Sequence, residues 1–260
     1  MMKNIFYRFA FFLLLVSCSN ATHYGSPEVN PLEIQKNFMD WWTYHYNNVM
    51  LSRDFFGLDA NAKEISKEEF LIALRDGGFI PIRLNSSNEE NFHYQLFKIE
   101  PSSDTSIQAT IAEEAFSTLH NYKKEGTAFP NFSFKDLDGN LISNDNLKGK
   151  IVVVKCWFIH CVACIEEFPE VNAMAAKYKN RKDIVFISLA EDTPEQLRTF
   201  LAKRPLSYSV VPNLKLYMNE TLQINGFPTH FIVNKEGIIE KVTSNYHDLA
   251  VAFQQVSSEK

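Results

Sequence analysis

The second half of the chain predicts an α/β fold, in which a mixed sheet is flanked by helices. Residues 151–154 read Ile-Val-Val-Val, an unbroken β-branched run that is typical of a strand buried on both faces. Beyond residue 164, apolar side chains recur at helical spacing from Ile165 to Ala175. A buried strand that runs directly into a helix is therefore the element around which this half is organised.

The other elements of this half alternate between strand and helix. Two short apolar segments around the Asp138-Gly139 turn predict a β-hairpin ahead of the buried strand. Thr193 followed by Pro194 and Gln196 is the signature of a helix N-terminus. The remaining segments are expected strands at 184–189, 208–211, 231–234 and 238–242, and expected helices at 194–203 and 248–255. After the hairpin, the predicted order of strands and helices along the chain is β-α-β-α-β-β-α.

A Cys-x-x-Cys motif, Cys161 to Cys164, stands where the buried strand meets the helix. At a helix start, free backbone N–H groups and the helix dipole favour an anion. A thiol placed there has its pKa lowered from about 8.5 to roughly 3.5–7.5, which makes it a reactive thiolate. Cys161 is nearest the helix start and the more exposed of the two, so we expect it to be the nucleophile. Cys164 is then the resolving cysteine of a redox-active pair.

Metal binding is the alternative use of such a motif. A zinc site is disfavoured because the only other cysteines are Cys18 and Cys156, and no second Cys-x-x-Cys or His-x(3–5)-His is present. A Cu(I) site remains open as a second function, since soft copper prefers thiolate ligands. In that case Cys161 and Cys164 act with His160 or His230, as a copper-binding or copper-delivery module.

The motif and its surroundings resemble the thioredoxin superfamily, and specifically the membrane-tethered TlpA/ResA-like thiol-disulfide oxidoreductases. In that pattern an apolar strand and an aromatic pair precede Cys-x-x-Cys, and Glu-x-Pro follows it, here as Glu167-Phe168-Pro169. A second landmark is the segment from Gly226 to His230, which precedes an apolar strand and contains Pro228. These folds carry a cis-proline at that place, facing the dithiol. The resemblance covers residues 124–260.

The resemblance implies a thioredoxin-like fold preceded by a β-hairpin, and it implies an enzyme. The expected activity is protein-disulfide oxidoreduction in the reductive direction, with disulfide-bearing proteins as clients and a membrane thiol-disulfide electron donor. No cofactor is expected beyond the redox-active disulfide. Cys161, Cys164, Pro228 and Glu167 are the implied catalytic residues. Copper chaperones of the same fold carry Cys-x-x-x-Cys, one residue longer than the motif here.

Three charged or titratable residues near the motif have open roles. Lys155 lies six residues before Cys161, where thioredoxin has a buried acid, and it either tunes the dithiol from a buried position or emerges at a sheet edge. His160 either stabilises the neighbouring thiolate as an imidazolium or is merely exposed beside it. Glu167 lies one helical turn beyond Cys164, so it either exchanges that thiol's proton or is a solvated helix residue.

The N-terminal end predicts a targeting segment over residues 1–17, with basic residues followed by an apolar stretch. The sequence Leu-Val-Ser-Cys at 15–18 resembles a bacterial lipobox, which implies cleavage before Cys18 and lipidation of its thiol. An ordinary secretory signal with an incidental Cys18 is the alternative. A lipid anchor implies a periplasm-facing protein of the cell envelope, and Ser19 favours the outer membrane. Residues 18–31 are polar and turn-rich, as expected for a tether.

Residues 32–123 predict an α+β accessory region. Ile34, Phe38, Trp42, Tyr46 and Met50 recur every four residues, which we interpret as the core face of a helix rather than a partner groove. A capping box at Ser66–Glu69 opens a helix to Arg75. Strands at 79–84 and 93–99 and a helix at 107–123 complete the region. The chain's net charge of −5 gives no support for a nucleic-acid partner.

Overall fold

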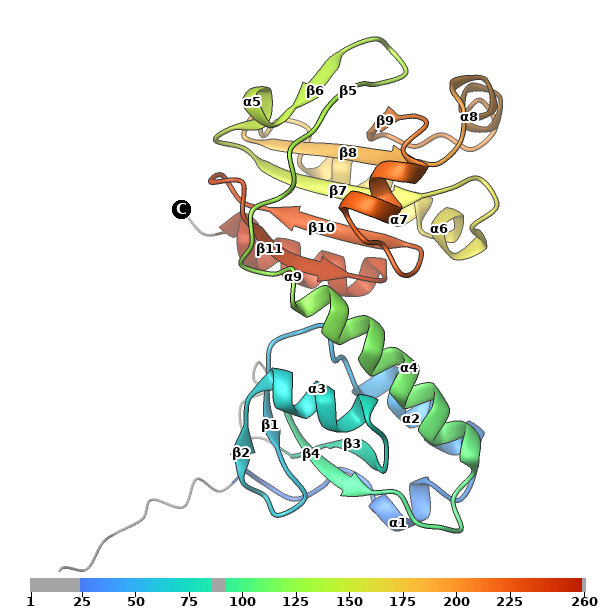
Figure 1. The fold of residues 1–260 in the computed structure, drawn as a ribbon, viewed down its shortest axis with the longest axis vertical. Coiled ribbons are helices and arrows are strands. Elements are labelled where there is room, and N and C mark those ends of the chain that lie inside the picture. Colours follow the sequence, from blue (N-terminus) through green and yellow to red (C-terminus); the bar gives the residue numbers. More distant parts are fainter. Residues whose placement is uncertain (1–23, 86–91, 259–260) are drawn as a thin grey trace, which may run out of the picture.

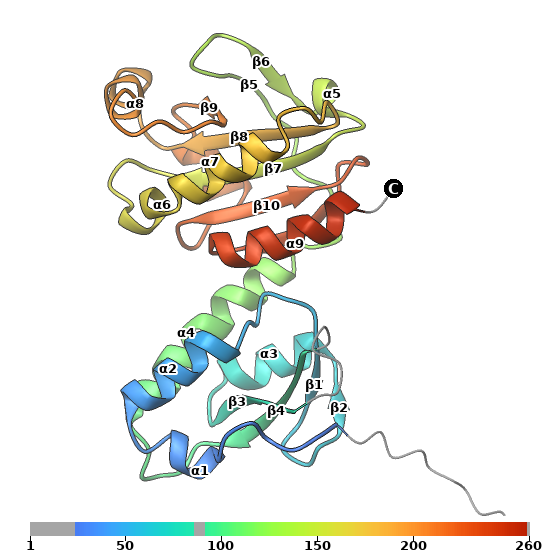
Figure 2. The same cartoon turned by 180° about the vertical axis from the view of Figure 1, so that it is seen from behind.

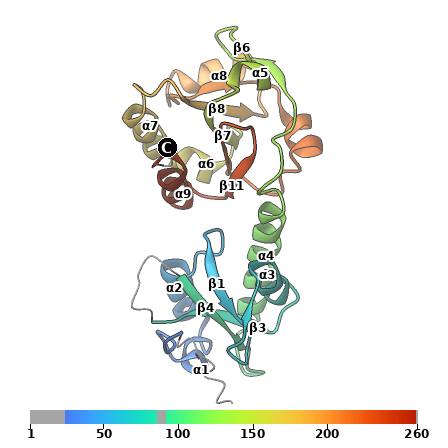
Figure 3. The same ribbon diagram turned by 90° about the vertical axis from the view of Figure 1, so that its left-hand side faces the viewer.

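The computed structural model describes residues 24–85 and 92–258, which form two parts, each with a main sheet and its own helices (Figure 1). The predicted signal segment 1–17 and the predicted lipidation site Cys18 lie outside the described residues. No helix within the described ranges combines the length and the apolar character that a membrane crossing requires. Figure 3 shows the two parts one above the other, joined by a long helix.

The first part is an α+β unit around a four-stranded sheet in the order β2-β1-β4-β3. Strands β1 and β4 are parallel, and the other neighbours are antiparallel. The capping box predicted at Ser66 is present and opens α3. The strands are β1 (Phe55–Leu58), β2 (Glu64–Ile65), β3 (Phe79–Arg83) and β4 (Phe92–Lys98), and the helices are α1 (Pro31–Ile34), α2 (Phe38–Asn48), α3 (Lys67–Arg75) and α4 (Thr105–Tyr122).

The expected single helix face from Ile34 to Met50 is wrong in two respects. The helix is interrupted after Ile34, and Asn37 caps a new one, α2, by accepting hydrogen bonds from two backbone N–H groups. The buried residues of α2 are Trp41, Tyr44 and His45, whereas Tyr46 is 71% exposed. A spacing of four residues advances about 400° around a helix, so the stripe drifts about 40° per step and leaves the core.

The second part has the thioredoxin-like fold that the sequence predicts. Its five-stranded sheet has the order β11-β10-β7-β8-β9, with β7 in the centre. Strands β7, β8 and β9 are parallel, while β10 is antiparallel to β7 and to β11. The strands are β5 (Ser133–Lys135), β6 (Leu141–Ser143), β7 (Ile151–Trp157), β8 (Ile184–Ala190), β9 (Ser209–Val211), β10 (Thr229–Val233) and β11 (Ile239–Thr243). The helices are α5 (Asn144–Leu147), α6 (Val162–Glu166), α7 (Phe168–Lys177), α8 (Pro194–Leu201), the π-helical turn η1 (Tyr217–Thr221) and α9 (Tyr246–Ser258).

Both faces of this sheet are covered, which explains why β7 is buried along its whole length. Val153 packs with Val171 of α7 and Leu249 of α9 on one face. Figure 2 shows these two helices running side by side across the sheet. On the opposite face, Val154 packs with Phe129 of the segment that precedes the β5–β6 hairpin. The hairpin itself turns at Gly139, whose φ of 85° is the positive value expected for that turn.

Polar contacts join the two parts. Lys241 of β11 forms ion pairs with Asp54, at 2.6 Å, and with Glu125, at 3.1 Å. The Ser52 hydroxyl donates a hydrogen bond to the Asp248 carboxylate near the start of α9. The loop between α2 and β1 therefore contacts the redox half at β11 and α9.

Candidate active site

Cys161 and Cys164 form a disulfide at the junction of β7 and α6, with Cα atoms 5.3 Å apart. Cys161 is the N-cap residue of α6, and its Sγ accepts a hydrogen bond from the backbone N–H of Cys164 at 3.2 Å. Cys161 is 8% exposed, whereas Cys164 is fully buried. Cys161 is therefore the sulfur that a partner reaches first, in the order that helix geometry predicts.

The loop that carries the disulfide is held by the neighbouring strand β8. The Asp192 carboxylate, just beyond β8, accepts a hydrogen bond from the Ile159 N–H at 2.8 Å. The Trp157 indole N–H donates to the Ser188 hydroxyl of β8 at 3.2 Å. The Trp157 ring also packs edge-on against Phe168 of α7, with ring centroids 5.1 Å apart. These contacts fix the end of β7 and so the place of the two cysteines.

The Pro228 loop lies beside the disulfide. The Phe227–Pro228 peptide bond is cis, as the resemblance implies. The Phe227 ring packs edge-on against Phe158, with centroids 5.3 Å apart, and it borders the apolar cluster that contains both cysteines. The segment before β10 and the segment before α6 therefore make one continuous surface at the dithiol.

The side chains around Cys161 leave an apolar surface open to a partner. Val162 is 68% exposed, and Phe158 and Phe227 are half-buried. His160 is exposed and, among the described residues, makes no hydrogen bond or ion pair. The structure therefore places His160 next to the site without linking it to either sulfur. A charge on its ring is screened by solvent.

A buried ionic cluster lies where β7, β10 and the α6–α7 junction meet, and Glu167 is its centre. The Lys155 ammonium donates to Glu167 Oε2 at 2.6 Å, and His230 Nε2 lies 3.0 Å from the same oxygen. The backbone N–H of Tyr246 donates to Oε1 at 2.7 Å. The Lys155 and His230 side chains are fully buried, and that of Glu167 is 13% exposed. We call these three side chains the Lys155–Glu167–His230 cluster.

This geometry decides two alternatives that the sequence leaves open. Lys155 does not emerge at a sheet edge, because β7 is the central strand and the residue is fully buried. Glu167 is not a solvated helix residue, since it is held by three donors. Proton exchange with Cys164 stays a prediction for Glu167.

Burial and charge set the protonation states in the cluster. Burial lowers the pKa of His230, and the nearby Lys155 charge lowers it further, so the imidazole is neutral. Burial also lowers the pKa of Lys155, against the opposing pull of Glu167. Burial alone would raise the pKa of Glu167, but the hydrogen bonds and charges of His230 and Lys155 outweigh it and lower that pKa. Because a carboxylate only accepts, the neutral His230 carries its proton on Nε2.

The sequence did not predict that His230 belongs to this cluster, because its only expected role was that of a possible copper ligand. The available signal was its place on a buried strand two residues after Pro228. His230 of β10 is the cross-strand partner of Lys155 of β7, which brings both to Glu167. Across residues 24–85 and 92–258, no group of three His, Cys, Asp or Glu side chains is arranged to hold a metal ion. The copper alternative thus has no support.

The remaining described cysteine, Cys156, is buried and unpaired. Burial raises the pKa of its thiol to about 12. It is therefore neutral at physiological pH and packs as a small apolar side chain in β7.

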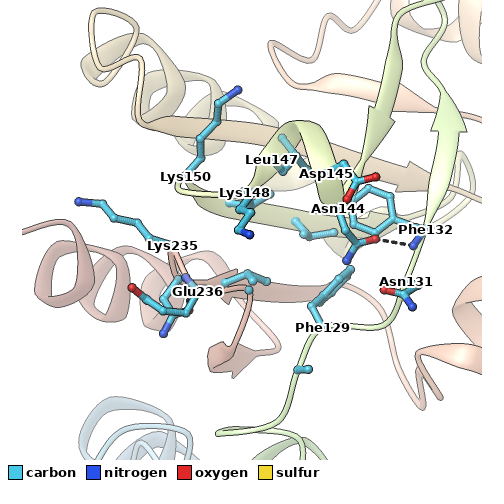
Figure 4. A pocket seen from close by; sticks show the side chains of 16 residues that line it. Phe129, Asn131, Phe132, Asn144, Asp145, Leu147, Lys148, Lys150, Lys235 and Glu236 are labelled. Atoms are coloured by element: carbon cyan, nitrogen blue, oxygen red, sulfur yellow. Dashed lines mark hydrogen bonds between the residues drawn. The ribbon is translucent and has the colours of Figure 1, made fainter.

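A separate cavity of about 290 Å³ lies between the β7–β10 layer and the segments before and after the β5–β6 hairpin (Figure 4). Phe129 and Phe132 form part of its wall, and Lys148, Lys235 and Glu236 stand at its rim. None of the residues that line it belongs to the disulfide loop or to the Lys155–Glu167–His230 cluster. This cavity is not part of the candidate active site.

The AhpC/TSA family model matches residues 126–242. The chain is 32% identical over 119 residues to thiol-disulfide oxidoreductase ResA of Bacillus cereus, which covers 45% of this chain and 68% of that protein. It is 31% identical over 124 residues to ResA of Bacillus subtilis, which covers 46% of this chain and 67% of that protein. It is 27% identical over 121 residues to the thioredoxin-like protein YneN of Bacillus subtilis, which covers 46% of this chain and 71% of that protein.

Among solved structures, the chain is similar to the thioredoxin domain of a thiol-disulfide oxidoreductase from Bacteroides vulgatus, with 26% identity and a TM-score of 0.46. That match covers 50% of this chain and 96% of the other. A putative thiol:disulfide interchange protein DsbE from Chlorobium tepidum gives 23% identity and a TM-score of 0.46, covering 51% and 96%.

Proposed function

The chain belongs to the ResA-like family of thiol-disulfide oxidoreductases, and from that premise we propose that its Cys161–Cys164 dithiol reduces disulfides in client proteins outside the cytosol. The observation that carries this proposal is the disulfide at the strand-to-helix junction, in which Cys161 is 8% exposed and Cys164 is fully buried. The apolar surface around Cys161 offers a place for a client polypeptide beside the Pro228 loop.

The reaction follows thiol-disulfide exchange. The Cys161 thiolate attacks one sulfur of the client disulfide, a bond forms between the two, and the other client sulfur leaves as a thiolate. Cys164 then attacks Cys161 Sγ, forms the intramolecular disulfide and releases the second client thiolate. Two electrons pass from the dithiol to the client, whose two thiolates take up protons at neutral pH.

The buried thiol of Cys164 has to lose its proton before it attacks. We assign that proton to Glu167, which follows Cys164 by one helical turn and carries a carboxylate at neutral pH. Lys155 and His230 act as positioning residues, because both bond to the same Glu167 oxygen and hold the carboxylate in place. Pro228 shapes the loop that receives the client, and His160 acts at most as a solvent-screened modulator of the thiolate.

The charges near the dithiol indicate a couple that is only weakly oxidising, which is compatible with the proposed reductive direction. The N-cap position of Cys161 stabilises its thiolate and so the reduced form, which pushes toward an oxidant. However, the intervening residues Val162 and Ala163 bring no charge or polar donor. The Lys155 cation and the Glu167 anion also cancel each other. We therefore expect a weakly oxidising couple, which a membrane thiol-disulfide donor keeps reduced.

The proposed location is the cell envelope, facing the periplasm. The lipobox-like sequence at residues 15–18 supports lipid attachment at Cys18, and Ser19 favours the outer membrane. Of the predicted tether, residues 24–31 pack on the accessory region instead, because the Glu28 N–H donates to the Arg83 carbonyl and Asn30 caps α1. The polar residues 19–23 are left as the proposed tether that gives the dithiol access to clients.

Insulin reduction tests the activity. The full-length protein with excess dithiothreitol should accelerate the precipitation of the insulin B chain over dithiothreitol alone, and Cys161→Ser should abolish the acceleration. Cys156→Ser is the matched control, because that thiol is buried away from solvent and should leave the rate unchanged. A Cys161→Ser protein as active as the parent would contradict the proposed mechanism.

A further inference from the structure

A second and larger cavity, of about 900 Å³, lies between the accessory region and the redox half. Its walls come from α2, the segment after α2, the middle of α4 and the start of α9. Glu167 also lines it, so the cavity reaches the Lys155–Glu167–His230 cluster. Its volume is within the range of sites that bind small molecules or several side chains of a peptide.

The cavity lies on the same side of the molecule as the dithiol. In Figures 1 and 2, α6, the first turn of α9 and α2 are all on one side. Glu167 follows Cys164 by three residues, about 5 Å along a helix axis. An extended segment of three to four residues spans about 10–14 Å, which is the reach that we assign between the cavity and Cys161.

The cavity is acidic. Its lining contains the carboxylates of Glu113, Glu114, Glu167 and Asp248 and the rings of His45 and His247, and it contains no lysine or arginine. Behind the wall, Lys155 pairs with Glu167 and Arg53 lies 3.9 Å from Asp248. A third cation, Lys67, donates to the Ser52 carbonyl behind the same wall. Glu113 and Glu114 are then the lining carboxylates without a lysine or arginine partner among the described residues.

Two of the carboxylates, Glu113 and Glu114, are consecutive residues of α4 and differ in their partners. Glu114 pairs with His45 at 2.6 Å. Glu113 is exposed and forms no ion pair within the described residues. His45 is itself 3% exposed, and its second ring nitrogen, Nδ1, is buried without a hydrogen-bond partner. The wall therefore offers the exposed carboxylate of Glu113 to a cationic ligand, whereas the buried His45 Nδ1 is out of a ligand's reach.

An aromatic wall faces the same cavity. Trp42 and Tyr46 of α2 line it, with ring centroids 6.0 Å apart, and Tyr46 is 71% exposed. A cation held over such rings gains cation–π attraction in addition to its attraction to the carboxylates. An aromatic wall next to unpaired carboxylates is a surface that suits lysine and arginine side chains.

We propose that the cavity between the accessory region and the redox half docks a basic segment of the client polypeptide, placing a lysine or arginine over the Trp42–Tyr46 wall while the client disulfide reaches Cys161. This inference rests on the proposed function and names its substrate class: disulfides with a basic residue three to four positions away. It also gives residues 32–123 a role, because α2 and α4 supply most of the acidic and aromatic lining.

Binding without chemistry tests the docking alone. The full-length Cys161→Ser/Cys164→Ser protein is titrated with fluorescent ten-residue peptides in which a serine replaces the client cysteine. The residues three and four positions away are Arg-Arg, Gln-Gln or Glu-Glu. The Arg-Arg peptide should bind about tenfold more tightly than Gln-Gln at low salt, and Glu-Glu should bind most weakly.

Variants locate the site. Glu113→Lys should weaken binding of the Arg-Arg peptide by roughly three- to tenfold, because an exposed attraction becomes a repulsion. Tyr46→Ala should weaken it about threefold through the lost aromatic face. Both side chains are exposed, so neither substitution opens the core. Glu236→Lys is the matched control: an exposed glutamate in the β10–β11 turn, outside this cavity, whose reversal should leave binding unchanged.

Reduction of the same peptides as disulfides separates the two proposals. A kcat/KM preference for Arg-Arg that Glu113→Lys removes supports both. Reduction of all three peptides at equal rates, or equal binding by the Glu113→Lys and Glu236→Lys proteins, overturns the docking and leaves the reductase intact. Charge-dependent binding without any reduction overturns the proposed function and leaves the docking. Arginine amide binding as tightly as the peptide would overturn a polypeptide occupant.

Discussion

Removal of the Glu167 carboxylate should destabilise the redox half by an amount that depends steeply on pH. Glu167→Gln leaves the Lys155 ammonium buried without its 2.6 Å partner. Breaking a buried pair from one side costs about 3–5 kcal/mol. The buried Lys155 can also lose its proton and become neutral. Deprotonating a group of pKa about 10.4 at pH 7 costs roughly 4.6 kcal/mol, so the loss of stability cannot exceed that value.

The sign of the pH dependence follows from this deprotonation of Lys155. In the variant, a neutral Lys155 is favoured in the folded state, whereas the unfolded chain binds the proton. Stability then rises with pH toward the unfolded pKa, and the limit falls to about 1.9 kcal/mol at pH 9. In the parent protein, the Glu167 carboxylate opposes the loss of this proton, so the same rise should be smaller.

Lys155→Met supplies the matched comparison. Without the cation, Glu167 keeps its hydrogen bonds from His230 and from the Tyr246 backbone, so the cost should be about 1–2 kcal/mol. The double variant should cost at least about 1.5 kcal/mol less than the sum of the single variants. Hydrogen exchange of the β7 and β10 amides in the oxidised protein gives the three free energies of opening. Additivity within about 0.5 kcal/mol would refute the coupling.

Three further outcomes are expected. The free energy of unfolding of the parent should fall by up to about 1.4 kcal/mol per pH unit below about pH 6.5, because folding keeps His230 neutral. Amide exchange of His230→Asn should show a smaller dependence of this free energy on pH. An equal dependence in both proteins would contradict the assignment to His230. Cys164→Ser should accumulate mixed disulfides with client proteins through Cys161, seen on non-reducing gels, and Cys161→Ser should not; the reverse pattern would exchange their roles. Full-length protein should fractionate with membranes, and Cys18→Ala should release it or leave the signal uncleaved; a mature unlipidated N-terminus beyond Cys18 would exclude the anchor.

The redox half was predictable because its signals are local. An unbroken apolar run is enough to identify β7, and the capping box at Thr193 marks the start of α8. The same logic failed around α2, because Ile34 ends α1, Met50 lies beyond α2, and positions spaced by four residues drift around the helix between them. It also missed β1, in which Gly57 interrupts the apolar run. A Cβ on Gly57 would lie 2.8 Å from the Phe70 ring, so a glycine is needed where α3 crosses the strand.

The two cysteines could be identified from spacing alone, but the Lys155–Glu167–His230 cluster could not. Lys155 and His230 are 75 residues apart in the chain, and they meet only because β10 lies next to β7. Strand order is a property of the whole domain, and the sequence of neither strand alone predicts it. The acidic cavity is equally non-local, because α2, α4 and α9 each supply part of its wall.

The reduction potential of the Cys161–Cys164 couple tests the central claim most directly. The full-length protein is equilibrated in glutathione and dithiothreitol buffers, and the reduced fraction is read from the mass added when both thiols are alkylated. A reductase should have a midpoint near that of thioredoxin, about −270 mV, and far from about −120 mV for DsbA. That gap of roughly 150 mV corresponds to about 7 kcal/mol for two electrons. A midpoint above about −160 mV would show that the protein oxidises its clients and would contradict the proposed direction of electron flow.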